Sequence, residues 1–345
     1  MPIYRINPLC DDRWNQFVNG HSRGSVFHTA EWLSLLRDTY NYEPVAYTAQ
    51  PGNSPLAEAL VFCGVHSWIT GARLVSLPFS DHCEPLVDGP EGLSKLFSAP
   101  FDEYKQGKWR YLELRPLATA NALGLERIPE EYLLHVLDLR PSLDELYRSL
   151  HVDSIRRKIQ RGEREGLTIE SGNSSELLTE FYRLHLATRR RQQLPPHPFR
   201  WFRNLLRTMG HKATIRIAKR KAVAIAAVLT LSHNKCLTYK YGCSDSRFHN
   251  LGGMPFVFWD MIRHAKSVGM EQLDLGRSAI HNSGLVTFKD RWGTSKYPLI
   301  YGRYPAKKYA DNPNSVHMRI AKYFISKSPD RILKVAGNWL YPHIG

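Results

Sequence analysis

Hydrophobic positions along the chain recur at two spacings, and the two spacings predict a mixture of helices and strands. In the first part of the sequence, Trp32, Leu35 and Leu36 lie at the spacing of one helix face and predict a helix over Glu31–Thr39. A shorter helix is expected at Gly92–Phe97. Short apolar runs predict strands at Val45–Thr48, Glu58–Val65, Arg73–Leu77, Tyr111–Arg115 and Leu133–Asp138.

The same order of elements returns in the second part of the chain. Helices are expected at Ser154–Gly166, Ser175–Gln192, Phe199–Met209 and Pro255–Val268. Strands are expected at Leu167–Ser171, Ala213–Lys219, Ala222–Leu231, Cys236–Cys243, Gln272–Leu275 and Leu299–Arg303. The repeated order predicts an α/β (α+β) fold of two domains packed side by side, and residues 315–345 are expected to add one or two amphipathic helices.

Composition changes this picture little. The chain has 345 residues, of which 43% are hydrophobic and 23% charged, a balance typical of globular proteins. No apolar run reaches the roughly 18 residues that a membrane-spanning helix needs. The start of the chain lacks the pattern of a secretory signal, and the five cysteines are scattered without a metal-ligand spacing. We therefore expect a cytoplasmic protein with no disulfide framework and no metal.

The charge balance is more informative. Lysine and arginine number 47 against 32 aspartate and glutamate, a net charge of +15. Such an excess raises the local concentration of anions at the surface. Nucleic acid, an anionic membrane face and a phosphorylated small molecule all fit as partners.

Two basic segments are candidate anion sites. In the first, Arg157, Arg161 and Arg164 share one face of the expected helix, where guanidinium groups could bind phosphate or carboxylate. The alternative is a solvated basic face, balanced by neighbouring glutamates. In the second, the helix ending near Gln192 carries three consecutive arginines, including Arg190. Basic side chains at a helix C-terminus also favour the helix dipole, so a structural explanation is equally available.

A tyrosine-rich strand precedes a possible phosphate-binding turn. By the two-residue period of a strand, Tyr239 and Tyr241 are predicted to share one face. Asn250, Gly252 and Gly253 then lead into a helix whose free N–H groups could bind a phosphate or an oxyanion. A plain strand-to-helix connection is the alternative.

Lys289 is the strongest candidate for a catalytic residue. It follows Phe288 and precedes Asp290 and Trp292, in a segment that begins with a short strand ending in glycine. A lysine among aromatic side chains can supply a fixed positive charge to a developing oxyanion. The alternative is a surface lysine paired with Asp290. Motifs of serine hydrolases, P-loop enzymes, zinc proteases and dinucleotide-binding enzymes are absent from the sequence.

Several of these segments together resemble a known family. The resemblance is to the Fem family of peptidoglycan-bridge aminoacyltransferases and to FemAB-like relatives with a GNAT-like (BioF2-like) acyltransferase domain, some of which belong to exopolysaccharide systems. It covers about residues 25 to 305. The matching segments are Ser76–Asp81, Arg156–Gly166, Thr188–Pro195, Tyr241–Asp245, Asp274–Ser278 and Gly284–Gly293.

The resemblance implies two tandem GNAT-like acyltransferase domains, at residues 1–140 and 141–310, followed by a helical tail at residues 311–345. It implies acyl transfer from an activated donor to an amine, without a metal or a covalent intermediate. Lys289 would stabilise the oxyanion, and Asp81 or Asp245 would be the general base. The substrate-binding residues would be Arg157, Arg161, Arg190, Tyr239, Tyr241, Arg277, Ser278, Phe288 and Trp292.

The donor and the acceptor stay open at this level. The turn at Asn250, Gly252 and Gly253 departs from the glycine spacing with which GNAT enzymes hold coenzyme A, and the chain has no room for the helical arm that some Fem enzymes use for tRNA. The donor is therefore either an acyl-coenzyme A thioester or an aminoacyl-tRNA, used as a co-substrate and not bound permanently. The acceptor would be an amine on a cell-envelope glycan or peptidoglycan precursor, anionic or lipid-linked, with contact to the inner membrane face. The alternative is an inactive module that binds polysaccharide or nucleic acid.

Overall fold

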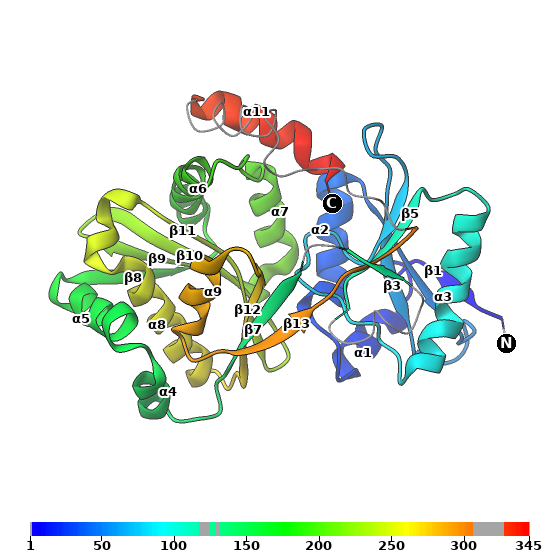
Figure 1. The fold of residues 1–345 in the computed structure, drawn as a ribbon, viewed down its shortest axis with the longest axis horizontal. Helices are drawn as coiled ribbons and strands as arrows, with labels where there is room; N and C mark the ends of the chain where they lie inside the picture. Colours follow the sequence, from blue (N-terminus) through cyan, green and yellow to red (C-terminus); the bar gives the residue numbers. More distant parts are fainter. Residues whose placement is uncertain (1, 117–124, 129–130, 306–327, 345) are drawn as a thin grey trace. The chain divides into compact units, whose positions relative to one another are not determined.

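The computed structural model describes residues 2–116, 125–128, 131–305 and 328–344, which form two compact units (Figure 1). The first unit consists of the described residues within Met1–Tyr132, Tyr297–Ala310 and Trp339–Gly345. The second consists of those within Leu133–Lys296 and Asp311–Asn338. The sequence-based boundaries at 140 and 310 differ from this division, because the chain returns to the first unit after residue 296.

The first unit is built on a seven-stranded sheet of order β1-β2-β3-β4-β5-β14-β6. Its strands are β1 (Tyr4–Ile6), β2 (Glu43–Thr48), β3 (Leu60–Val65), β4 (Arg73–Val75), β5 (Tyr111–Leu114), β14 (Gly302–Tyr304) and β6 (Glu126–Arg127). Its helices are α1 (Arg13–Gly20), α2 (Ala30–Tyr40) and α3 (Pro90–Lys105), with single turns η1 (Val26–His28) and η6 (Tyr341–His343). The apolar face of α3 packs on the sheet through Leu93, Leu96 and Phe97.

The second unit is built on another seven-stranded sheet, of order β13-β7-β12-β11-β10-β9-β8. Its strands are β13 (Ser295–Leu299), β7 (Tyr132–Asp138), β12 (Gln272–Ala279), β11 (Cys236–Ser244), β10 (Val223–His233), β9 (Ala213–Arg220) and β8 (Leu167–Gly172). The prediction of a single strand at Leu299–Arg303 is therefore wrong, because the two ends of this segment belong to strands of different sheets. Ile300 and Tyr301 connect these two strands.

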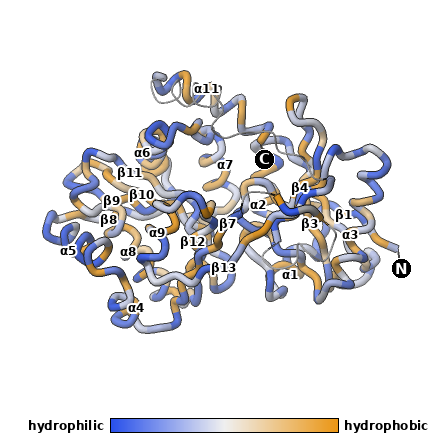
Figure 2. Tube along the Cα trace, in the orientation of Figure 1, coloured by the Kyte–Doolittle hydropathy of each residue, from blue (hydrophilic) through white to orange (hydrophobic). Residues whose placement is uncertain are grey.

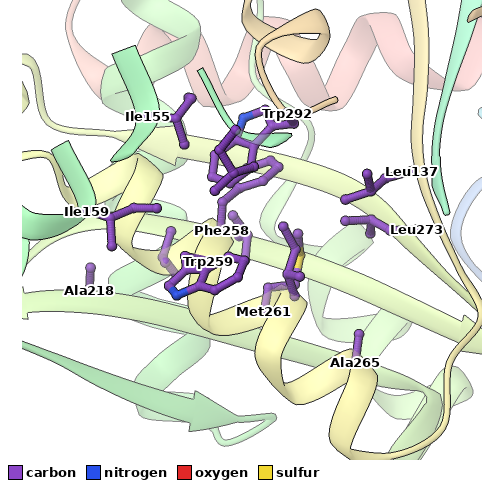
Figure 3. Close-up of a cluster of buried hydrophobic side chains, with 14 of the residues drawn as sticks. Leu137, Ile155, Ile159, Ala218, Phe258, Trp259, Met261, Ala265, Leu273 and Trp292 are labelled. Carbon is purple, nitrogen blue, oxygen red and sulfur yellow. The ribbon is translucent and has the colours of Figure 1, made fainter. Parts of the chain in front are cut away.

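Helices cover both faces of this second sheet. They are α4 (Leu143–Ser149), α5 (Arg157–Arg164), α6 (Ser175–Arg191), α7 (Phe199–Met209), α8 (Gly253–Ser267) and α9 (Ser283–Asp290), with short turns η3 (Val152–Arg156), η4 (Gly210–Lys212) and η5 (Ser246–Leu251). α6 and α7 lie on one face, and α5 and α8 on the other (Figure 1). The core under α8 includes Phe258, Trp259 and Trp292, with Ile155 and Ile159 of the neighbouring basic segment (Figure 3). These two isoleucines dock the basic helix, as the sequence predicts.

β11 and β12 are parallel neighbours that separate along their length. They pair only where Cys236–Thr238 lies beside Gln272–Asp274, although β11 continues to Ser244 and β12 to Ala279. The turn η5 and the start of α8 follow directly after β11. This geometry places the end of β11 at the candidate site.

A β-bulge overturns one sequence prediction about β11. The pairing of β10 with β11 shifts between Leu229 and Thr230, so Lys240 is an extra residue in β11. Tyr239 consequently packs on Phe258 of α8, at 4.7 Å between ring centroids, and Tyr241 packs on Phe202 of α7, at 5.1 Å. The two tyrosines lie on opposite faces of the sheet, whereas an unbroken two-residue period would put them on the same face.

The expected helical tail is described only in part. α11 (Asp330–Leu340) confirms one amphipathic helix, and Figure 2 shows hydrophilic and hydrophobic residues alternating along it. Residues 311–327 of the predicted tail lie outside the described residues. Across the described ranges, no helix is long and apolar enough to cross a membrane.

The start of α8 lies unusually close to α5. Gly252 has φ +76°, and a Cβ atom placed on it would lie 2.2 Å from the carbonyl oxygen of Lys158. One helical turn further along α5, a Cβ on Gly162 would lie 3.0 Å from the ring of Phe256. Two glycines therefore allow the two backbones to approach, and α5 fixes the position of the first turn of α8.

We expect Gly252→Ala to reduce the free energy of unfolding by about 1–3 kcal/mol more than Gly269→Ala. Gly269 is the matched control, because it has the same φ of +76° but no atom within 4 Å of the position that a Cβ would take. The difference isolates the contact with α5 from the cost of the left-handed backbone. Urea unfolding of both variants measures it, and equal losses would show that the close approach does not matter.

Candidate active site

A pocket of about 290 Å³ opens at the N-terminus of α8 in the second unit. Its walls come from the α5 segment, β10, the end of β11, η5, α8 and α9. One side is apolar, formed by Ile155, Ile225, Phe248 and Phe288. Its remaining lining residues are Ser154, Lys158, Ala226, Ser244, His249, Gly253, Met254, Pro255, Gly284 and Arg291.

The polar side of this pocket is suited to an anion. Lys158 and Arg291 contribute two positive charges. Gly253 and Met254 occupy the first positions of α8, where backbone N–H groups have no acceptor within the helix. The first intrahelical bond there runs from the Phe256 N–H to the Gly252 carbonyl, at 3.0 Å. Cations and free N–H groups at the positive end of a helix dipole together favour a phosphate or a carboxylate.

A hydrogen-bond network supports the floor of the pocket. Ser244 Oγ lies 2.9 Å from His249 Nε2, and the Ser244 N–H donates to Thr188 Oγ1 at 2.9 Å. Arg191 Nη1 donates to the Ser244 carbonyl at 3.1 Å. Burial lowers the pKa of His249, and the nearby cations Arg191 and Lys158 lower it further. His249 is therefore neutral near pH 7 and can accept or donate a hydrogen bond.

The residues predicted to bind a cofactor have different positions in the structure. Gly253 lines the pocket. Gly252 is buried against Lys158 and serves the contact between α5 and α8. Asn250 is exposed in η5 and is not among the residues that line the pocket. The site thus uses the helix start itself and not a glycine-rich loop.

Lys289 is buried, so the alternative of a surface lysine paired with Asp290 is wrong. Its side chain is only 2% exposed, and Nζ donates to the carbonyl oxygens of Gly276 at 2.9 Å and Arg277 at 2.8 Å. Gly276 has φ +71°, and its N–H donates to Asp274 Oδ1 at 2.6 Å. Asp290 instead pairs with Lys296 at 3.0 Å. The ammonium of Lys289 is a fixed charge that also holds β12 in an irregular conformation.

Aromatic residues connect Lys289 with the pocket. Phe288 precedes it on α9, lines the pocket and packs edge-on against Phe258, with ring centroids 5.5 Å apart. Trp292 is fully buried and stacks on Phe258 at 5.0 Å, which gives it a place in the core and none in the pocket lining. Tyr239 packs on the same Phe258 ring. Phe258 is thus the common support of the predicted aromatic residues.

The basic segments contribute different residues from those predicted. Arg157 is 72% exposed and pairs with Asp153, and Arg161 pairs with Glu165, each partner four residues away. The neighbouring Lys158 is the residue that lines the pocket. Lys158 lies in the sequence next to Ile159 and three residues after Ile155, the two buried residues that dock the helix, and this position could have identified it.

The arginine run of α6 is divided in a similar way. Arg190 donates to the Ser328 carbonyl at 3.1 Å and pairs with Asp330, so it anchors the start of α11. Arg191 is the member that reaches Ser244, at the floor of the pocket. In the sequence, nothing distinguishes the arginine that contacts α11 from the one that contacts Ser244.

The two general-base candidates differ in their environment. Asp245 is buried, caps η5 and accepts four hydrogen bonds from Arg247, one from the backbone N–H and three from the guanidinium group. These bonds lower the pKa of Asp245, which makes its carboxylate a weak base and disfavours the predicted role. Asp81 lies half-buried in the first unit, where its carbonyl accepts a hydrogen bond from the Tyr301 hydroxyl at 2.5 Å. Its role as a base stays a prediction.

The remaining predicted residues lie on β12. Arg277 is half-buried and offers its carbonyl to Lys289. Ser278 is buried, and its Oγ has no hydrogen-bond partner within the part of the chain that the structure describes. Their predicted contact with substrate stays a prediction.

The first unit contains a strained loop at the segment Ser76–Asp81. Leu77 and Phe79 have positive φ angles, +47° and +61°, which are costly for residues other than glycine. Arg115 stabilises the loop by donating its N–H to Ser76 Oγ at 2.8 Å and its guanidinium to the Leu77 carbonyl at 3.4 Å. Strain of this kind, held by specific contacts, is typical of functional loops.

Comparison with known proteins agrees with this architecture. The sequence model of the acetyltransferase (GNAT) domain matches residues 150–289. A UDP-N-acetylmuramoylpentapeptide-lysine N(6)-alanyltransferase of Weissella viridescens is 22% identical over 315 residues, which cover 84% of this chain and 91% of that protein. The crystal structure of FemX superposes with a TM-score of 0.69 at 14% identity, over 87% of this chain and 97% of that one. A tandem GNAT protein from the clavulanic acid biosynthesis pathway has a TM-score of 0.56 at 12% identity, over 89% and 99%.

These matches show that residues 150–289 contain an acetyltransferase (GNAT) domain and that the chain has the fold of tandem GNAT-like proteins, which supports an acyltransferase. Within that class, the resemblance to the Fem-type aminoacyltransferases is confirmed.

We expect Lys289→Met to reduce the free energy of unfolding by about 2–4 kcal/mol, because it leaves the buried Gly276 carbonyl and the part-buried Arg277 carbonyl without this donor. Lys296→Met is the matched control. Its ammonium pairs with Asp290 at the surface, so its loss should cost less than about 1 kcal/mol. Urea unfolding gives both values. A Lys289→Met protein as stable as the control would contradict the anchoring role.

The buried His135 of β7 should make stability depend on pH. Burial and the positive charge of Lys289 lower the pKa of His135 from 6.5 to about 4. The unfolded chain therefore binds a proton between these values while the folded protein does not, so stability is full above about pH 6.5 and falls toward pH 4. Between pH 6.5 and 4.5, we expect the free energy of unfolding to fall by about 2 kcal/mol more in the unchanged protein than in His135→Gln. Urea unfolding at both pH values tests this, and parallel pH profiles for the two proteins would refute it.

Proposed function

We propose that this acyltransferase moves an aminoacyl group from an activated ester donor to an amine in the peptide of a peptidoglycan precursor. The observation that carries the proposal is the pocket at the start of α8, where Lys158, Arg291 and two helix N–H groups surround a space next to the separated strands β11 and β12. The similarity to the alanyltransferase of Weissella viridescens supports the choice of the transferred group and the acceptor.

In this proposal the pocket binds the phosphate-bearing carrier of the donor. Lys158 and Arg291 neutralise the phosphate charge, and the Gly253 and Met254 N–H groups donate to its oxygens. The apolar side, including Phe288, packs against the uncharged part of the carrier. The free amine of the acceptor attacks the donor carbonyl, the new C–N bond forms, and the bond between the carbonyl and the carrier oxygen breaks.

Lys289 would act on the oxyanion that forms during this attack. Its ammonium is fixed by the Gly276 and Arg277 carbonyls, so no reorganisation of the side chain is needed when negative charge develops. The acceptor amine must lose a proton, and Asp81 and Asp245 are the two candidates for the base; Arg247 lowers the pKa of Asp245, which makes it the weaker base.

Three observations favour an aminoacyl ester over an acyl-coenzyme A thioester as the donor. The relative in Weissella viridescens is named for alanyl transfer. Gly252 is already in contact with Lys158, so the turn before α8 does not form an open glycine cradle. The net charge of +15 suits a large nucleic-acid carrier such as aminoacyl-tRNA.

A transfer assay with purified components tests the reaction. The protein is incubated with UDP-linked muramyl pentapeptide and either alanyl-tRNA or acetyl-coenzyme A, and the mass of the pentapeptide is followed. We expect a gain of one aminoacyl residue with the tRNA donor, abolished by ribonuclease. Transfer from acetyl-coenzyme A would show that the donor is a thioester and not an aminoacyl ester. No transfer from either, combined with tight and salt-sensitive tRNA binding, would support an inactive binding module.

We expect Lys158→Ala and Arg291→Ala each to raise KM for the donor about tenfold, with kcat little changed, because one phosphate contact is worth roughly 1–2 kcal/mol. Arg157→Ala is the matched control on the same helix, since its guanidinium pairs with Asp153 in solvent. Steady-state kinetics with varied donor measures the effect. Equal effects of Arg157→Ala and Lys158→Ala would mean that the pocket is not the donor site.

A further inference from the structure

Two tryptophans of the first unit are exposed, and they lie together. Trp68 is 78% exposed and Trp339 is 56% exposed, with ring centroids 5.9 Å apart in an edge-to-face arrangement. Ile69 and Ile344 are also exposed. We call these four residues the tryptophan patch. The other six tryptophans of the chain are buried, so this patch differs from the rest of the aromatic residues.

The tryptophan patch is held in place by hydrogen bonds around His343. Ser67 Oγ lies 3.0 Å from His343 Nδ1, and Arg73 Nη2 donates to the His343 carbonyl at 2.7 Å. Thr70 Oγ1 donates to the same carbonyl at 3.2 Å. The ring of His343 lies between 5.6 and 5.9 Å from both tryptophan rings. The exposed rings are therefore presented by an ordered turn, so that binding through them requires little additional ordering.

The helix that carries Trp339 has two apolar faces. Leu333 and Gly337 of α11 are buried, and a Cβ on Gly337 would lie 2.1 Å from the Pro196 carbonyl. Ile332 and Val335 are exposed and precede Trp339 by seven and four residues, on one face of the helix. The exposed apolar residues Ile332, Val335 and Trp339 follow one another along α11, and such a stripe is typical of an interaction surface.

The charge around this surface favours an anionic partner. The sequence from Arg331 to Gly345 contains no aspartate or glutamate, whereas Arg331 and Lys334 are exposed on α11. Arg110 also lies at the edge of the patch, where its guanidinium donates to the Thr70 carbonyl at 3.4 Å. Indole rings partition to the boundary between lipid headgroups and acyl chains, and basic side chains around them bind anionic headgroups.

We propose that the tryptophan patch docks the protein on the surface of an anionic lipid bilayer. Trp68 and Trp339 enter the interface, and Arg110 of the same unit binds headgroups beside them. The attachment is peripheral and reversible, because the apolar area is small and no described helix can cross the bilayer. The proposal is independent of the transfer reaction. It would place the enzyme next to any acceptor carried by a lipid.

Vesicle binding of the purified protein tests the proposal. Sedimentation with vesicles of phosphatidylglycerol and phosphatidylcholine is compared with vesicles of phosphatidylcholine alone, while tryptophan emission is recorded. Only Trp68 and Trp339 are exposed, so insertion should shift the red edge of the emission to shorter wavelength, which purely electrostatic adsorption would not do. We expect binding and a blue shift with the anionic vesicles, both reduced by high salt.

The double variant Trp68→Ser, Trp339→Ser should bind anionic vesicles at least about tenfold more weakly and lose the blue shift. Tyr297→Ser is the matched control, since Tyr297 is an exposed aromatic residue of β13 outside the patch, and it should bind like the unchanged protein. Thermal unfolding confirms that both variants are folded. Absence of vesicle binding, or equal binding by the double variant, would overturn the proposal. So would a concentration-dependent dimer that only the double variant loses, because the patch would then bind a second copy of the chain.

Discussion

The close contact between α5 and the first turn of α8 is the constraint on which the candidate site depends. Gly252 allows the Lys158 carbonyl to approach the start of α8, and Gly162 allows Phe256 to pack against α5. Because both helix backbones are fixed relative to each other, Lys158 lies in the wall of the pocket that the α8 N–H groups face. A cation on a surface helix would otherwise be free to move away in solvent. The two glycines thus determine where the positive charge of Lys158 lies relative to the start of α8.

Lys289 provides the second fixed point, through its hydrogen bonds to β12. Removing an ammonium group from water is costly, and the carbonyls of Gly276 and Arg277 compensate for that cost. The same bonds keep β12 in its irregular conformation where it diverges from β11. Lys289 consequently has two effects: it supports β12, and its charge would stabilise the oxyanion in the proposed reaction. A single substitution would remove both at once. Stability and kinetic measurements must therefore be combined to separate them.

Much of the fold could be predicted from the sequence, and less of the site. Apolar spacing located α2, α6, α7 and most strands of both sheets, but not β6, β13 or β14, and aromatic context singled out Lys289. The opposite orientations of Tyr239 and Tyr241 could not be predicted, because one extra residue at Lys240 reverses the two-residue period and leaves no mark in composition. The pairing of β14 with β5 joins residues nearly two hundred positions apart, which local patterns do not encode. Lys158 and Arg191 were missed because charge runs do not show which member faces a pocket.

The most direct test of the donor site is hydrogen–deuterium exchange of the backbone amides at the start of α8, with and without donor probes. Two probes are used: coenzyme A, and an RNA microhelix ending in 3′-CCA that carries alanine through a stable amide bond. We predict that the alanyl microhelix slows exchange at Gly253 and Met254 and leaves the outer face of α5 unchanged. Protection confined to other segments of the second unit, or no protection by either probe, would show that this pocket does not bind the donor.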